Sequence, residues 1–269
     1  MTDSIFVRDG ERFIPTEHAR GPWDPQALHG GAPAALLAAA FERMEPGAEL
    51  GIARLGFEFL RPIPSAPLTL STSVLRAGRR VQELGGELHA GDSLVCRASA
   101  LRVQAVPADL PRPGPTAPEA TVAPAQQPLP PPESGELISF ALERSSGPGF
   151  GPTAMEMRWL DDPHAPGPGR VWMRLRHQLL PGEPLTPLAR VAAAADFGNG
   201  VSAALPFDRY LFINADLTIH LYRPAVGDWI GLDARTLLEA GGAGTAESVL
   251  HDTAGPIGRA FQTLVVQAR

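Results

Sequence analysis

The chain has 269 residues, of which 44% are hydrophobic and 19% charged, a composition typical of globular proteins long enough for two domains. A formal net charge of −6 leaves no broad basic surface, so we do not expect nucleic acid as a partner. No apolar run approaches the roughly 18 residues that a membrane span needs. The first residues lack the basic and apolar segments of a secretory signal, and we therefore expect a cytoplasmic protein.

The single cysteine, Cys96, excludes an internal disulfide and any zinc site built from several cysteines. It lies in the apolar run 93–98, which predicts a small core side chain and not a nucleophile. The histidines His177, His220 and His251 show no spacing typical of metal ligands. The sequence therefore predicts neither a metal nor a cofactor.

The first half of the chain predicts one helix followed by an antiparallel meander. Residues 31–44 form a nearly continuous, alanine-rich apolar run of helical length. Apolar and polar residues then alternate over 54–59, which is typical of a strand with one buried face. Three further strands are predicted at 68–75, 81–89 and 94–103, separated by turns that contain Gly78 and Gly91.

A proline-rich stretch separates this first half from the second. Ten prolines occur between residues 104 and 132, which excludes a helix or a central strand there. We expect an extended linker over 105–133, joining an N-terminal lobe of residues 1–104 to a C-terminal lobe of residues 134–269.

The second half repeats the order of the first. An alanine-rich run predicts a second helix over 188–205, and the strict alternation over 211–222 predicts the clearest strand in the protein. The remaining predicted strands are 154–160, 170–178, 228–237, 244–251 and 257–266.

A constant shift of 162 residues relates the two halves. It carries Arg61-Pro62 onto Arg223-Pro224, His89 onto His251, and Arg97 onto Arg259. The same ungapped shift aligns the alternating strand, its Arg-Pro exit and the last hairpin, which predicts a duplicated unit of helix plus antiparallel sheet.

A long apolar helix wrapped by an antiparallel sheet is the hotdog arrangement, and two such units in one chain resemble the double-hotdog acyl-CoA thioesterases of type II (TesB-like). The resemblance implies an α+β fold with two hotdog units. It is carried in the first half by Gly21-Pro22-Trp23-Asp24 and His29-Gly30-Gly31-Ala32-Pro33. In the second half it is carried by Met155-Glu156-Met157-Arg158, Val171-Trp172-Met173-Arg174, Ala194-Ala195-Asp196-Phe197 and Leu221-Tyr222-Arg223-Pro224. It also implies an acyl-CoA substrate and either a monomer or a homodimer of double-hotdog chains.

Asp196 is the expected catalytic residue. It is the only charged residue between Arg190 and Asp208, in a run of small apolar residues where a buried carboxylate is costly without hydrogen bonds. A helix end is the other interpretation, because Gly198 follows closely. In the resembled family, an Asp on the second helix holds the water with a Thr and a Gln. These two positions fall on Asn214 and Gln262.

Asn214 departs from the family's Thr, since it lacks a hydroxyl, although its amide both donates and accepts hydrogen bonds. Thr218, four residues further along the strand, is an alternative polar group for contacting the substrate. His29-Gly30-Gly31, at the predicted start of the first helix, is a second expected substrate contact because the first helical N–H groups lack intrahelical partners. A tight turn that packs the helix would use the same two glycines.

Two other functions stay open on the sequence. A hotdog enoyl-CoA hydratase is one, because Asp24 and His29 have the spacing of the hydratase acid and base pair, although the residues between them depart from that motif. A non-catalytic acyl-CoA-binding protein is the other, favoured by the Asn214 departure. Residues 200–204 lack the G-x-S-x-G pattern, which argues against a serine hydrolase.

Overall fold

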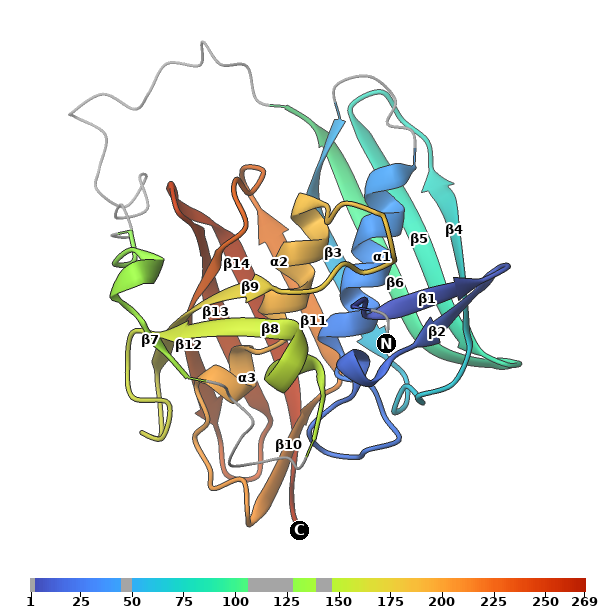
Figure 1. Ribbon diagram of the computed structural model, residues 1–269. Helices are drawn as coiled ribbons and strands as arrows, with labels where there is room; N and C mark the ends of the chain where they lie inside the picture. The colour runs from blue at the N-terminus through green and yellow to red at the C-terminus, as the bar shows by residue number, and fades with distance from the viewer. Residues whose placement is uncertain (1–2, 45–49, 106–127, 139–146) are drawn as a thin grey trace, which may run out of the picture.

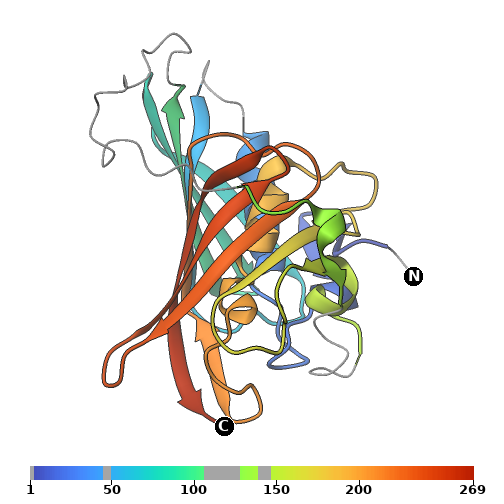
Figure 2. The same ribbon diagram turned by 90° about the vertical axis from the view of Figure 1, so that its left-hand side faces the viewer.

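The computed structural model describes residues 3–44, 50–105, 128–138 and 147–269 (Figure 1). Two helices, α1 (Gly31–Arg43) and α2 (Pro187–Ala195), lie side by side against one face of a large antiparallel sheet. Seen from the side, the helices occupy one layer and the long strands the other (Figure 2). Two helices on one antiparallel sheet confirm the expected α+β double-hotdog arrangement.

The sheet contains fourteen strands among the described residues, in the order β1-β2-β4-β5-β6-β3-β11-β14-β13-β12-β9-β8-β7, with β10 paired to β14. Their bounds are β1 (Phe6–Asp9), β2 (Arg12–Pro15), β3 (Leu50–Phe59), β4 (Leu68–Arg76), β5 (Val81–Ala90), β6 (Ser93–Gln104), β7 (Glu136–Leu137), β8 (Met155–Trp159), β9 (Gly169–Leu175), β10 (Tyr210–Asn214), β11 (Asp216–Leu221), β12 (Ile230–Leu238), β13 (Gly244–Asp252) and β14 (Gly255–Ala268). Shorter helical segments are η1 (Glu17–Ala19), η3 (Pro132–Ser134), η4 (Phe150–Ala154) and α3 (Gly198–Val201).

The strand bounds follow the predicted internal repeat. A shift of 162 residues carries β4 onto β12, and it brings β6 onto the first part of β14. At the centre of the sheet β3 pairs with β11, and Gly56 lies opposite Thr218, the residue onto which the shift carries it. A local twofold axis therefore passes between these two residues and relates the halves.

The two helices run antiparallel, and an acidic side chain lies near each N-terminus. Glu42 on α1 accepts a hydrogen bond from the Leu188 N–H at the start of α2 (3.2 Å), and burial raises the pKa of its carboxyl group. Asp196, the C-cap of α2, lies against Gly30 at the start of α1. Carboxylates near helix N-termini are stabilised by the unpaired N–H groups and the helix dipole, which offset part of the cost of burying the two acidic groups.

The C-terminus of α1 is capped by a buried arginine. Arg102 on β6 is 2% exposed and donates to the carbonyl oxygens of Phe41 (2.7 Å) and Met44 (2.6 Å). These carbonyls lie where intrahelical donors run out. The contact fixes the end of α1 against the sheet of its own lobe.

The predicted second helix is shorter than expected. It was predicted over 188–205, but α2 ends at Ala195 and a separate turn, α3, follows. Gln262 occupies the break, donating to the Asp196 carbonyl (3.0 Å) and accepting from the Asn199 N–H (2.9 Å). Because glycine weakens helices and this side chain replaces helical hydrogen bonds, the helix ends at the aspartate.

The strand predicted over 211–222 is also interrupted. It divides at Ala215 into β10 and β11, and the pairing with β14 slips by one residue across the break. Leu217 and Ile219 are buried as predicted, but on β10 Phe212 is buried (3% exposed) and Ile213 is not (39%). The prediction of one continuous face was wrong, because a one-residue irregularity exchanges the two faces of a strand.

The N-terminal hairpin was not predicted from the sequence. Strands β1 and β2 are joined by a turn at Gly10, whose positive φ of 60° favours glycine.

Only part of the expected linker is described. Residues 106–127 lie outside the described part of the chain, whereas residues 128–134 contact the second half through a hydrogen bond from Trp172 Nε1 to the Pro130 carbonyl (2.7 Å). The lobe boundaries at 104 and 134 stay a prediction. Within the described ranges, none of the helices has both the length and the apolar character needed to cross a membrane.

Candidate active site

Asp196 is a buried carboxylate with polar partners from both halves of the chain. Asp196 as a whole residue is 3% exposed to solvent. Asn214 Nδ2 on β10 donates to its Oδ1 (2.8 Å), and His29 Nδ1 lies 2.9 Å from its Oδ2. Burying a carboxylate is costly unless such contacts replace water, so the site is built to hold this group in one orientation.

His29 precedes α1, and its ring is held between aromatic side chains. It stacks on Phe197, with ring centroids 4.3 Å apart, and lies 5.2 Å from the Phe150 ring. The Gly31 N–H also approaches the same Nδ1, at 3.0 Å. One nitrogen cannot donate to Asp196 and accept from Gly31 at the same time, so its protonation decides which bond forms.

Gly30 and Gly31 allow the start of α1 to approach the end of α2. A Cβ atom at Gly30 would lie 2.8 Å from Asp196 Oδ2, and one at Gly31 would lie 2.8 Å from the Ala193 carbonyl oxygen. Neither glycine has a positive φ, so close approach and not backbone conformation is the reason for the residue type.

Asn214 reaches Asp196 because of the irregularity between β10 and β11. With one uninterrupted alternation, Asn214 would lie on the opposite face from Leu217 and Ile219, away from the helices. The break at Ala215 reverses this and directs its amide to the carboxylate, where it donates the hydrogen bond.

Gln262 lies next to Asp196 but contacts its backbone. The side chain is buried (3% exposed), and its amide nitrogen and oxygen bond to the Asp196 carbonyl and the Asn199 N–H. A Cβ at Gly198 would lie 2.8 Å from Gln262 Oε1, so the turn fits closely around this amide. The structure thus brings together Asp196, Asn214, His29, Gly30 and Gly31, and adds Gln262 through the main chain.

Thr218 lies elsewhere. It faces the side of the sheet away from the helices, in a cavity of about 600 Å³ whose lining includes Gly56 and Ser99. The break at Ala215 explains the separation. Positions 214 and 218 would share a face in a continuous strand, but the one-residue slip puts Asn214 and Thr218 on opposite faces of the sheet.

A cavity of about 380 Å³ opens beside Asp196. Its lining is mostly apolar and includes residues for which the sequence suggested no part in the site: Leu28, Phe59, Arg61, Ile63, Phe207, Ile213 and Val265. Trp23 stacks on Phe207, with ring centroids 5.2 Å apart, which gives the cavity an aromatic wall. Trp23 and Phe197 belong to the motifs noted in the sequence, and these motifs were the one sequence signal for this wall.

The other candidate groups have different surroundings. Burial raises the pKa of Cys96 to about 12, with a smaller effect from the charge of Asp196, so the thiol stays protonated. Ser202 is fully buried and donates to the Gly198 carbonyl or bonds to Thr236. Asp24 lines the same cavity as His29, but its carboxylate accepts from the Gln26 N–H (2.8 Å).

Comparisons with known proteins agree with this architecture. Residues 19–103 match the family described as acyl-CoA thioesterase N-terminal domain, and residues 118–266 match the acyl-CoA thioesterase C-terminal domain. No curated protein matches the sequence.

Solved structures share the fold at low sequence identity. A hotdog-fold protein from Alicyclobacillus acidocaldarius has a TM-score of 0.68 and 17% identity, covering 98% of this chain and 95% of its own. The tesB protein of Mycobacterium avium subs paratuberculosis has a TM-score of 0.61 and 18% identity, with 98% and 96% covered. The acyl-CoA thioesterase II TesB2 of Mycobacterium marinum has a TM-score of 0.61 and 17% identity, with 89% and 88% covered.

Because the two thioesterase domains follow one another over most of the sequence and fold as two hotdog units, the chain belongs to the acyl-CoA thioesterase family and is a thioester hydrolase.

Proposed function

We propose that the chain hydrolyses an acyl-CoA to the free acid and CoA with a water molecule activated by Asp196. The observation that carries the proposal is the buried Asp196 carboxylate, which is bonded to Asn214 and His29 and borders a mostly apolar cavity at the start of α1. Hydrolysis of a thioester needs a base for the attacking water and donors for the developing oxyanion. Both kinds of group are close together here.

Asp196 acts as the general base. It takes a proton from water as the water oxygen bonds to the thioester carbonyl carbon, and the carbon–sulfur bond then breaks to release CoA, whose sulfur receives the proton. When His29 Nδ1 carries its hydrogen and donates to Asp196, the Gly31 N–H loses its acceptor and is available to the oxyanion. The helix N-terminus favours negative charge at the same place.

Asn214 and Gln262 have different parts in this mechanism. Asn214 donates directly to the carboxylate and supplies the hydrogen bond expected from a Thr hydroxyl. Gln262 is a positioning residue, because both ends of its amide are bonded to the main chain around Asp196. It fixes where α2 ends and therefore where the carboxylate lies.

Arg61 is the proposed contact for the phosphates of CoA. It lines the cavity and is exposed, and among the described residues no carboxylate pairs with it. Its counterpart in the repeat, Arg223, is held by Asp252 through two bonds, one of 2.6 Å. The repeat carries Ala90 onto Asp252, so the first half has no carboxylate at the matching position. The free guanidinium suits a phosphate.

Replacing Arg61 by Gln should raise the KM for an acyl-CoA about tenfold with kcat nearly unchanged, as expected when a charged hydrogen bond to substrate is lost. Steady-state kinetics at several salt concentrations would measure it. Arg12→Gln on β2 is the control, since Arg12 is exposed and its one ion pair within the described part of the chain is with the neighbouring Asp9, at 3.5 Å. Equal KM values for Arg61→Gln and the unchanged protein would remove Arg61 from CoA binding.

Incubating the purified protein with acyl-CoAs of increasing chain length, octanoyl-CoA among them, tests the reaction itself. We expect free thiol to be released from the acyl-CoAs. With crotonyl-CoA, we expect the enoyl absorbance to persist until the thioester is cleaved. Loss of enoyl absorbance without thiol would identify a hydratase instead. A melting temperature raised by acyl-CoA without hydrolysis would identify a binding protein.

A further inference from the structure

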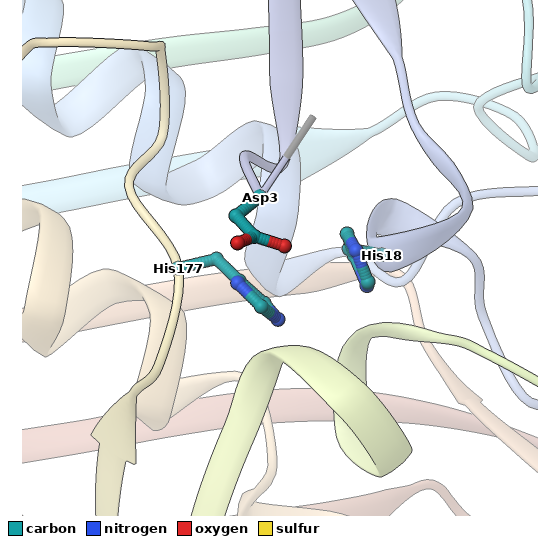
Figure 3. Close-up of side chains that lie close together, drawn as sticks. All are labelled: Asp3, His18 and His177. Atoms are coloured by element: carbon teal, nitrogen blue, oxygen red, sulfur yellow. The ribbon is translucent and has the colours of Figure 1, made fainter. Parts of the chain in front are cut away.

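Three side chains able to bind metals meet outside the proposed active site. Asp3, His18 and His177 each offer one ligand atom, and these atoms all lie within 4.8 Å of one another. Figure 3 shows them coming from three separate segments: the chain before β1, the helical turn η1 and the loop after β9. None of the three lines the cavity beside Asp196.

Backbone contacts hold these segments in place. Ser4 and Gln178 form a parallel bridge, and the Ile5 N–H donates to the Gln178 carbonyl (2.9 Å), which fixes Asp3 beside His177. Thr16 caps η1 by accepting from the His18 N–H (3.2 Å), and its hydroxyl is 2.7 Å from the Ser4 carbonyl. The chain itself therefore brings the three side chains together.

The tautomer of His18 suits a ligand. Its Nδ1 lies 2.7 Å from Thr153 Oγ1, and that hydroxyl donates to the Gly149 carbonyl (2.8 Å). Thr153 must then accept from His18, so Nδ1 carries the hydrogen and Nε2 has the free lone pair. Metal-bound histidines usually hold their other ring nitrogen in this way.

We propose that Asp3, His18 and His177 bind a divalent transition-metal ion, with zinc as the ion whose preference for imidazole and carboxylate ligands fits best. Three protein ligands leave the remaining coordination to water. In a tetrahedral site, ligand atoms about 2.1 Å from the ion lie about 3.4 Å apart, so shifts of about 1 Å close the present cluster. The two imidazole rings are stacked, with centroids 4.3 Å apart, and must turn to direct both lone pairs at the ion. Asp3 is exposed and His18 and His177 are half-buried, which leaves them room to do so.

The ion would join the two halves of the protein. Asp3 and His18 belong to the first half and His177 to the second, and the histidines are separated by 159 residues. Because only the folded chain brings the ligands together, binding stabilises the native state by linkage. The sequence spacing gave no sign of this site and predicted no metal, since positions so far apart match no local ligand pattern.

The test uses the full chain, freed of metal with a chelator, and zinc chloride as the probe. Titration calorimetry should show one zinc ion bound per chain, and the melting temperature should rise by about 5 °C at a zinc concentration about a hundredfold above Kd. His18→Gln, His177→Gln and Asp3→Asn should each weaken binding at least about tenfold. His220→Gln is the matched control, because it removes an exposed histidine from β11 and leaves the cluster intact.

Asp3→Asn is the variant least expected to misfold, because this exposed side chain can lose its charge without disturbing the core. Metal-free thioesterase activity and melting temperature serve as the fold check for the histidine variants. The proposal is overturned if the folded His18→Gln and His177→Gln proteins bind zinc like the unchanged chain. It is equally overturned if the unchanged chain takes up no zinc. It is also overturned if zinc competes with acyl-CoA in the unchanged chain and in every variant, because the ion would then bind at Asp196 and not at this cluster.

Discussion

Asp196→Asn should lower kcat for acyl-CoA hydrolysis by at least about a hundredfold, the usual scale for loss of a general base. The amide has nearly the same shape as the carboxylate but cannot take a proton from water. Its oxygen can still accept from Asn214, and its nitrogen can donate to His29 Nδ1 when that atom carries no hydrogen. The fold should therefore be preserved, and thiol release under saturating substrate measures the loss.

Asp216→Asn provides the matched control for this experiment. Asp216 begins β11, across the Ala215 break from Asn214, and its Oδ1 accepts from the Thr263 N–H (2.6 Å). The substitution removes the same charge two residues from Asn214 without touching Asp196. Near-normal turnover in Asp196→Asn, with an unchanged melting temperature in both variants, would exclude Asp196 as the base.

Gly31→Ala should have the largest effect on stability. The new Cβ would lie 2.8 Å from the Ala193 carbonyl oxygen and 2.8 Å from Phe150 Cε1. A backbone atom cannot rotate away, so α1 and α2 must separate. Overpacking of this kind costs about 1 to 3 kcal/mol of the free energy of unfolding. Because the same shift moves Asp196 relative to His29, kcat should fall as well. Denaturant unfolding and steady-state kinetics measure the two effects.

Gly51→Ala is the comparison. Gly51 lies on β3, and a Cβ there would meet nothing within 4 Å. Replacing a strand glycine in open space should be neutral or slightly stabilising, because glycine loses more backbone entropy on folding. If Gly31→Ala kept both stability and turnover, close helix approach would not be the reason for the paired glycines.

Much of the fold could be predicted from local pattern. The strands of both meanders lie within a few residues of the predicted ranges, because alternation and turn residues act over short distances. Asp196 could be selected because one carboxylate in an apolar helical run needs a hydrogen-bonded environment. The glycines after His29 also pointed to the site, although their pattern did not identify the atoms that they approach.

The sequence by itself determined which segments become strands and helices, that the unit is duplicated, and that Asp196 is the unusual carboxylate. Only the tertiary structure decided where α2 ends, which face of β10 is buried, that Asn214 and not Thr218 reaches Asp196, and that Asp3, His18 and His177 meet. Each of these depends on partners distant in the chain: Gln262 at the helix end, the slipped pairing with β14, and the docking of the N-terminal segment on residues 178–179. Periodicity reports the neighbours of a residue along the chain, whereas these features are fixed by neighbours across the sheet and between the halves.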